Sequence, residues 1–166
     1  MTIDTIMQSI VESPLAVSIA EDPVLFPWLE LAHVLAITIV FGSILLVDLR
    51  LMGLAARDYP IARLSKAVVP VTWVAFLFAA ATGSLLFISN AVTYYGNVYF
   101  RAKILLMLCA GLNMAIFHVW TWRNVSQWDE SPRVPTAVRF AGVISALLWV
   151  AIIVCGRWIG FTMAPF

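Results

Sequence analysis

Four long apolar stretches, separated by short polar segments, dominate the pattern of hydrophobic and polar positions along this chain. They cover residues 26–49, 68–89, 102–122 and 137–160. Each approaches the roughly 20 residues that a helix needs to cross about 30 Å of hydrocarbon, and a helix satisfies its own backbone hydrogen bonds inside a bilayer. The pattern therefore predicts an all-α integral membrane protein. We expect a four-transmembrane-helix bundle, forming a single domain over residues 26–166.

The first 25 residues show a different pattern. Apolar side chains recur there at helical spacing among polar ones: Ile3, Ile6, Met7, Ile10 and Val11. This spacing predicts an amphipathic helix lying on the membrane surface, which Pro14 would end or kink. A disordered acidic leader is the alternative. No basic n-region precedes the segment, so a cleavable signal peptide is not expected. Pro70 is expected in the first turn of the second span, where a missing N–H does little harm.

Basic residues are concentrated in two of the connecting segments. Arg50, Arg57, Arg63 and Lys66 follow the first apolar stretch, and Arg123, Arg133 and Arg139 follow the third. The N-terminal segment has no basic residue but carries Asp4, Glu12, Glu21 and Asp22. Because cytoplasmic loops are rich in Lys and Arg, both termini are expected outside, in the periplasm of a bacterial inner membrane.

Composition agrees with a membrane location and excludes several functions. The chain is 63% hydrophobic and 11% charged, with a mean hydropathy of +0.97, whereas soluble domains are about a quarter charged. Its net charge of +1 gives no reason to expect nucleic-acid binding. Cys109 and Cys155 lack the spacing of a structural zinc site. Small residues such as Ala79 and Gly83 predict close helix contacts, within one chain or in a homo-oligomer.

Ionisable groups inside the spans mark where chemistry is expected, because such groups are costly in a membrane and usually face a bundle interior. His33 and Asp48 lie fifteen residues apart in the first span, and Lys103 and His118 lie fifteen apart in the third. Fifteen residues return a helix to nearly the same face and advance it by about 22 Å. The spacing predicts an outer level with His33 and Lys103, and an inner level with Asp48 and His118.

The outer level has the composition of a haem b site. His33 is the candidate iron ligand, since haem iron is commonly held by His, or by His with Met. The other candidate cofactor-binding residues at this level are Glu30, Lys103, Met107 and Arg157. Lys103 or Met107 would supply the second ligand, Arg157 would pair with a propionate, and Glu30 would orient the imidazole. A haem there would exchange electrons with a quinone or a redox protein.

Other functions remain open at this point. His118 with Asp48 could hold a second haem or a metal ion, or form a structural pair. The same polar groups would also suit a non-enzymatic assembly or accessory subunit with internal polar networks. A small-solute or proton conduit is disfavoured because no broken helix or inverted repeat is visible. Copper binding through Met107, Met114 and the histidines lacks the usual dense ligand clusters.

Several segments together carry a specific resemblance. They are FPWLELAH (26–33), GSILLVDLRLMGL (42–54), ATGSLLF (81–87), FRAK (100–103), AGLNMAIFH (110–118) and GRWIGF (156–161). From about Phe26 to Phe161 the chain resembles a widespread family of bacterial four-span inner-membrane proteins with no assigned function. This resemblance implies the fold and the inner-membrane location.

A weaker similarity concerns layout alone. A histidine in the first span, an Arg-bearing loop after it and a lysine that opens the third span are similar to the four-helix membrane protoporphyrinogen oxidases, which bind haem b. Membrane domains of copper-resistance proteins share the histidine in the first helix. The similarity implies that His33 is the haem ligand and that Lys103 matches the lysine. The residues after the histidine, Val40-Phe41-Gly42-Ser43, depart from the oxidase pattern.

Overall fold

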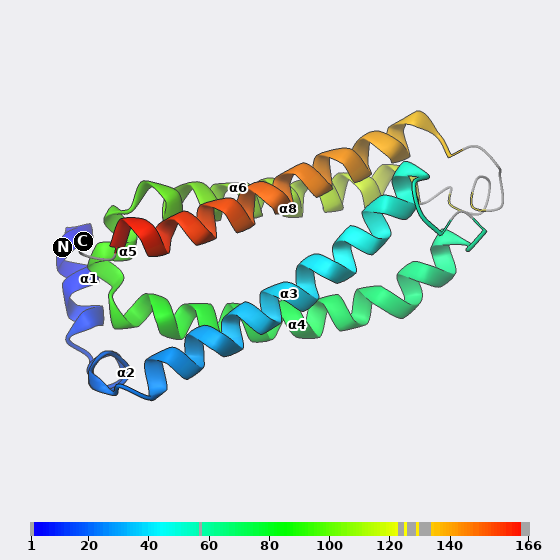
Figure 1. The fold of residues 1–166 in the computed structure, drawn as a ribbon. Helices are drawn as coiled ribbons and strands as arrows, with labels where there is room; N and C mark the ends of the chain where they lie inside the picture. The colour runs from blue at the N-terminus through cyan, green and yellow to red at the C-terminus, as the bar shows by residue number, and fades with distance from the viewer. Residues whose placement is uncertain (1, 57, 123–124, 126–128, 130–133, 164–166) are drawn as a thin grey trace.

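The four apolar stretches form four long helices that run back and forth along one bundle (Figure 1). A computed structural model describes residues 2–56, 58–122, 125, 129 and 134–163. The long helices are α3 (Leu25–Met52), α4 (Ile61–Ser89), α6 (Val98–Ile116) and α8 (Thr136–Met163), and α6 continues into a π-helix, η1 (Phe117–Thr121). Each of the four spans is long and apolar enough to cross a membrane. The predicted all-α, four-span architecture is confirmed.

The second span begins earlier than its apolar residues predict, and the start of α4 explains why. The Asp129 carboxylate accepts hydrogen bonds from the backbone N–H groups of Ile61 and Ala62. An acceptor there satisfies N–H groups that have no partner within the helix. The helix therefore extends two turns beyond the apolar stretch. Pro70 lies inside α4, and its expected place in the first turn is wrong.

Other helix ends are fixed by local signals that the sequence carries. Gly53 ends α3 in the left-handed conformation, with φ +74°, and its N–H bonds back to the last turn. Only glycine adopts this conformation without a steric penalty. Asn97 caps the start of α6 through its side-chain oxygen, and its amide nitrogen donates to Thr162 Oγ1 at 2.7 Å. This bond ties the start of α6 to the end of α8.

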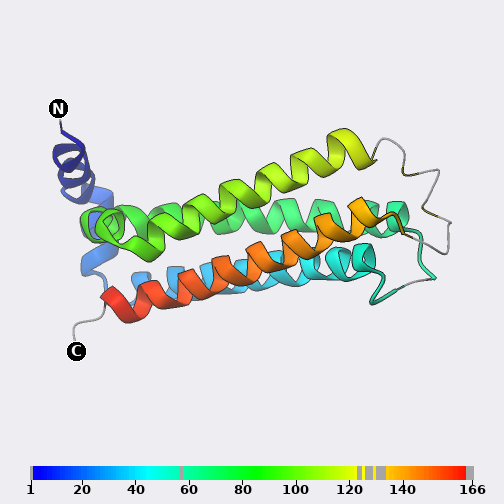
Figure 2. The same ribbon diagram turned by 90° about the horizontal axis from the view of Figure 1, so that it is seen from above.

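The bundle is built from two helix pairs. α3 packs along α4 and α6 packs along α8, while α3 and α8 join the pairs. α4 and α6 scarcely touch. At the crossing of α3 and α8, a Cβ on Gly142 would lie 3.0 Å from Leu51 Cβ and 3.1 Å from the Asp48 carbonyl oxygen. Gly142 thus permits the backbone contact that joins the pairs near the end farthest from the termini (Figures 1 and 2).

Three short helices cover the end of the bundle that carries both termini (Figure 1). They are α1 (Ile3–Val11), α2 (Pro14–Glu21) and α5 (Ala91–Gly96). The helix predicted before Pro14 is present as α1, and Pro14 also begins a second helix that the sequence analysis did not expect. α1 contacts α5, and α2 packs on α4, where Ala16 and Ile19 are fully buried.

The opposite end of the bundle holds the basic connections. Leu51, Ile61, Phe117 and Val138 form a buried apolar cluster there, where the long helices end or begin. Arg50 is buried beside this cluster, and its Nε donates to the Tyr59 carbonyl at 2.8 Å. Among the basic residues used to predict topology, Arg57, Arg123 and Arg133 lie outside the described residues.

Candidate functional site

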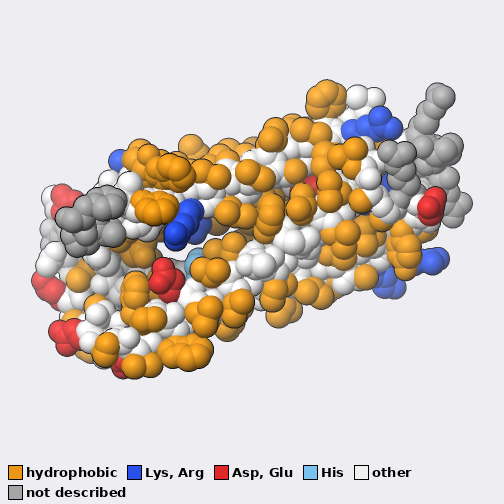
Figure 3. Space-filling model, in the orientation of Figure 1, with side chains coloured by type: hydrophobic (Ala, Val, Ile, Leu, Met, Phe, Trp, Pro, Cys, Tyr) orange, Lys and Arg blue, Asp and Glu red, His pale blue; other side chains and the backbone are white. Residues whose placement is uncertain are grey.

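The polar residues of the spans lie at two levels, in the pairings that the fifteen-residue spacing predicts. Lys103 on α6 lies within electrostatic reach of His33 on α3. Asp48 on α3 and His118 on η1 line one cavity. Figure 3 shows basic, acidic and histidine side chains gathered around a hollow between α8 and α3, toward the end with the termini.

At the outer level, His33 is half-buried and turned toward α4. Its Nδ1 lies 3.1 Å from the Thr82 hydroxyl oxygen. That hydroxyl donates its own proton to the Phe78 carbonyl at 2.9 Å, and the Ala79 carbonyl is 3.2 Å away. The Ala79 carbonyl is a second acceptor within reach of the imidazole. When Thr82 uses its single proton on its own helix, its oxygen accepts from Nδ1–H. In a neutral imidazole this leaves Nε2 unprotonated, the form that binds a metal.

Gly83 makes room for the imidazole. A Cβ built on Gly83 would lie 2.8 Å from His33 Cε1 and 3.3 Å from Nδ1. Any larger side chain would push the ring away from Thr82. The small residues of α4 thus position this histidine, which gives a specific role to the close contact that Ala79 and Gly83 predicted.

Lys103 is the cation of this level. Its Nζ lies over Gly156 of α8, 3.6 Å from where a Cβ would stand, and near Cys155. No described carboxylate forms an ion pair with it. A half-buried ammonium without a counter-ion, close to a histidine, is a suitable partner for an anionic group.

The other residues predicted for the outer level, Glu30, Arg157 and Met107, do not contact His33 among the described contacts. Glu30 is exposed and lies within electrostatic reach of Tyr94 on α5; burial first, and then this charge, raises the pKa of the Tyr94 phenol. Thr82, rather than Glu30, is the partner of His33 Nδ1. Arg157 is exposed, with its guanidinium 4.6 Å from the centre of the Phe161 ring. Met107 lines the inner cavity.

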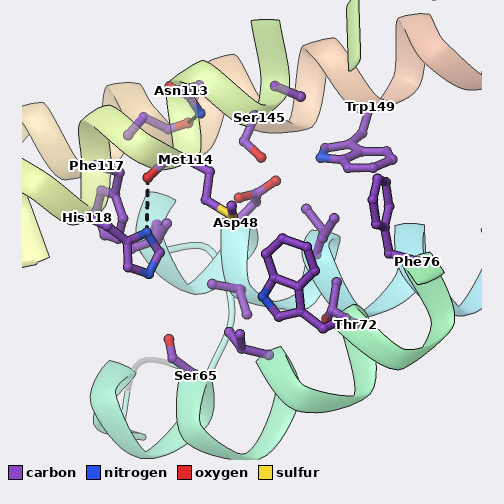
Figure 4. A pocket seen from close by; sticks show the side chains of 18 of the residues that line it. Asp48, Ser65, Thr72, Phe76, Asn113, Met114, Phe117, His118, Ser145 and Trp149 are labelled. Carbon is purple, nitrogen blue, oxygen red and sulfur yellow. Dashed lines mark hydrogen bonds between the residues drawn. The ribbon is translucent and has the colours of Figure 1, made fainter. Parts of the chain in front are cut away.

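At the inner level, Asp48 is 4% exposed and lies beside a cavity of about 210 Å³ (Figure 4). The Ser145 side chain faces the Asp48 carboxyl group (Figure 4). The carboxyl oxygen Oδ2 is buried and has no hydrogen-bond partner among the described residues. Unpartnered polar atoms at such depth are rare and call for an explanation.

His118 lies at the edge of the same cavity, in the π-helix. Its Nδ1 is 3.0 Å from the Met114 carbonyl oxygen, which can only accept, so Nδ1 carries the proton. The ring stacks on Trp122, with centroids 5.6 Å apart and planes at 30°. π-helices are rare and often occur at functional sites. The described residues contain no group of three or more His, Cys, Asp or Glu side chains arranged to hold a metal ion.

One family model matches the part of the chain that contains both levels. Residues 25–162 match the family described as "Family of unknown function (DUF6644)". The chain belongs to this family. No curated protein and no solved structure matches it. The matched range includes α3, α4, α6 and α8 almost entirely and excludes α1 and α2.

Within this DUF6644 chain, sequence reasoning found the charged residues of both levels but missed the neutral residues that position them. Thr82 and Ser145 were not assigned any role beside His33 and Asp48. A hydroxyl next to glycine in the run Ala79–Gly83 was the available signal for Thr82. Ser145 carries no such signal, since one serine in an apolar helix ordinarily bonds its own backbone.

Proposed function

We propose that this chain is a membrane haem b protein that exchanges electrons with a quinone or a protein partner, with His33 as the iron ligand. The observation that carries the proposal is the contact between His33 Nδ1 and the Thr82 hydroxyl, which also lies against a carbonyl of its own helix. In the neutral tautomer that this contact favours, Nδ1 carries the proton and Nε2 presents a lone pair. Hydrogen bonding of the second ring nitrogen is how proteins orient a ligating histidine and raise its basicity.

The surroundings of His33 suit such a cofactor. Four-helix bundles build cofactor sites in their cores from facing helices. Here α3 supplies His33 and α4 supplies Thr82, while α6 and α8 supply Lys103 and Gly156. The ammonium of Lys103, which has no described ion-pair partner, would serve a propionate or act as the second ligand. Arg157 is a further propionate partner. Because Met107 lines the inner cavity, Lys103 is the better candidate for the second ligand.

When bound, the haem would supply one-electron chemistry. The protein's own contribution would be the orientation of the ligand, the positive charge beside it and the exclusion of water by the apolar helices. Each of these is a recognised means of setting a haem potential.

The same proposal includes a topology. We place both termini, with α1, α2 and α5, on the periplasmic side of a bacterial inner membrane, and the basic connections in the cytoplasm, following the positive-inside bias. α1 would lie at the periplasmic surface of this inner membrane. The haem level would then face the periplasm, and a homo-oligomer would be compatible with the lipid-facing helices.

An absorption spectrum tests the proposal directly. The full chain would be expressed with added haem precursor, purified in detergent, and measured with and without dithionite. We expect a Soret band and a reducible α-band in the wild type and in His118→Ala, the matched control at the other level. We expect His33→Ala to lose both bands while it stays folded by circular dichroism.

A colourless wild-type protein under these conditions would refute the haem assignment. If His33→Ala were then to weaken folding or self-association, the chain would instead be an accessory subunit in which the His33–Thr82 bond is structural. A pigment that survived in His33→Ala but not in His118→Ala would move the haem to the inner level and contradict the ligand proposed here.

A further inference from the structure

The inner cavity has the size and lining of a binding site for a single ring. It lies between α4 and α6, with α3 and α8 behind it (Figure 4). Its walls are mainly apolar and aromatic, and include Trp73, Phe76, Phe117 and Trp149. Its volume of about 210 Å³ is below the roughly 300–1,000 Å³ of sites for drug-sized ligands. One substituted six-membered ring would fill it.

The cavity is placed to receive its ligand from the bilayer. α4 and α6, the helices on either side of it, scarcely touch. Side chains on both rims are exposed on the outer surface of the bundle, Trp73 by 47% and Met114 by 42%. Both belong to helices that are long and apolar enough to span the membrane, so this surface faces lipid. A ligand entering there must be soluble in lipid.

Two hydrogen-bond acceptors interrupt the apolar lining. One is Asp48 Oδ2, which is buried and without a described partner. The other is His118 Nε2, which carries a lone pair in the neutral imidazole whose Nδ1–H is bonded to the Met114 carbonyl. Figure 4 shows this second ring nitrogen on the side of the ring that faces α4. The buried Asp48 Oδ2 needs a donor, and the exposed His118 Nε2 is able to accept a second one. The complementary ligand is therefore a lipid-soluble ring that carries two donors.

We propose that this cavity binds the head group of a quinol, the reduced, dihydroxy form of a membrane quinone. One hydroxyl donates to Asp48 and the other to His118, while the aromatic walls enclose the ring and its hydrocarbon tail leaves between α4 and α6. The proposal rests on the proposed function for its purpose, a membrane-borne redox partner, but binding itself does not require the haem.

Binding is measured by isothermal titration calorimetry on the full chain in lipid nanodiscs, without oxygen, with decylubiquinol and decylubiquinone as probes. We expect the quinol to bind roughly tenfold more tightly than the quinone, since each of its two hydroxyls donates a hydrogen bond worth about 1 kcal/mol and the quinone has no hydroxyl to donate. In Asp48→Asn the new amide is a donor, so the preference should disappear or reverse. His118→Phe should weaken quinol binding severalfold.

Filling the cavity provides a second variant that does not depend on charge. A Cβ on Gly111, which lines the cavity, would meet no atom within 4 Å, so Gly111→Leu should fold and abolish binding of both probes. Gly160→Leu is the matched control, because Gly160 is equally open and lies outside the cavity. It should bind both probes as the wild type does.

Three results would overturn the proposal: equal affinity for quinol and quinone in the wild type, unchanged binding in Gly111→Leu, or tighter binding of benzyltrimethylammonium than of quinol. The last would make the cavity a site for an organic cation. Because all titrations are repeated on His33→Ala, the two proposals fail separately. A pigmented protein that binds no quinol refutes this one alone, and a colourless protein that binds quinol refutes only the haem.

Discussion

Gly83→Ala is the change that most directly probes how the fold holds His33. The new Cβ would lie 2.8 Å from His33 Cε1, closer than real contacts allow, and 3.3 Å from Nδ1, so the imidazole must move. Overpacking of this kind costs about 1–3 kcal/mol, and the lost bond to Thr82 about 1 kcal/mol. Alanine in place of glycine within a helix returns about 1 kcal/mol. We expect the free energy of unfolding to fall by about 2 kcal/mol in total.

The assay is reversible unfolding in mixed micelles, followed by circular dichroism, together with the haem content of the purified protein. Gly160→Ala is the control, since it gains the same helix propensity in open space and should be neutral or slightly stabilising. In the double variant His33→Ala with Gly83→Ala the clash is gone, so the second change should be harmless or stabilising. A double-mutant cycle isolates this coupling. Gly83→Ala as stable as Gly160→Ala, with no coupling to His33, would refute the close contact.

Three further predictions follow from single contacts. Thr82→Val keeps the shape of the side chain but leaves His33 Nδ1–H without its acceptor; stability should fall by about 1 kcal/mol and haem occupancy should fall with it, both read from the assay above. Asp129→Ala removes the acceptor at the start of α4 and should cost about 0.5–2 kcal/mol, with faster hydrogen exchange confined to that turn. Asp22 accepts from the backbone N–H groups of Leu25 and Val24, which lower its pKa below the ordinary 3.8. The contribution of Asp22 to stability is therefore complete above its ordinary pKa and is lost as the pH falls through the lowered pKa of the folded state. NMR should show the protection of these two amides fading only in strong acid. In Asp22→Asn, which has no carboxyl group to titrate, the protection should not fade with acid.

The four spans and the two polar levels could be predicted because both depend only on local periodicity. Apolar length determines a span, and 3.6 residues per turn with a 1.5 Å rise determine which side chains share a face and a depth. His33 with Lys103, and Asp48 with His118, follow from that arithmetic alone.

The remaining features depend on contacts between segments far apart in the sequence. The start of α4 is set by Asp129, 68 residues from Ile61. The partner of His33 is determined by how α3 and α4 rotate against each other, which places Thr82, 49 residues away, beside the ring. The rotation of α6 likewise turns Met107 toward the inner cavity, although its spacing from Lys103 had suggested the outer level.

Each level contains a histidine whose Nδ1 is hydrogen-bonded to a helix, and the two levels differ in the charged side chain beside that histidine. In each, an oxygen on a helix holds the Nδ1–H of a histidine, Thr82 Oγ1 for His33 and the Met114 carbonyl for His118, and Nε2 is left with a lone pair. At the outer level the neighbouring charge is the cation Lys103, which favours an anionic cofactor whose metal takes the lone pair. At the inner level it is the carboxyl group of Asp48, which favours a ligand that donates.

This difference argues that the two levels bind different ligands, because the cation Lys103 favours an anionic group and the carboxyl group of Asp48 favours a hydrogen-bond donor. Their separation of about 22 Å along the helices is well beyond the range at which substitutions usually interact. Changes at His33 should therefore leave quinol affinity unaltered, and changes at Asp48 should leave haem content unaltered. Coupling between them would require a shift of the α3–α8 contact at Gly142, because that contact joins the two helix pairs between which both levels are built.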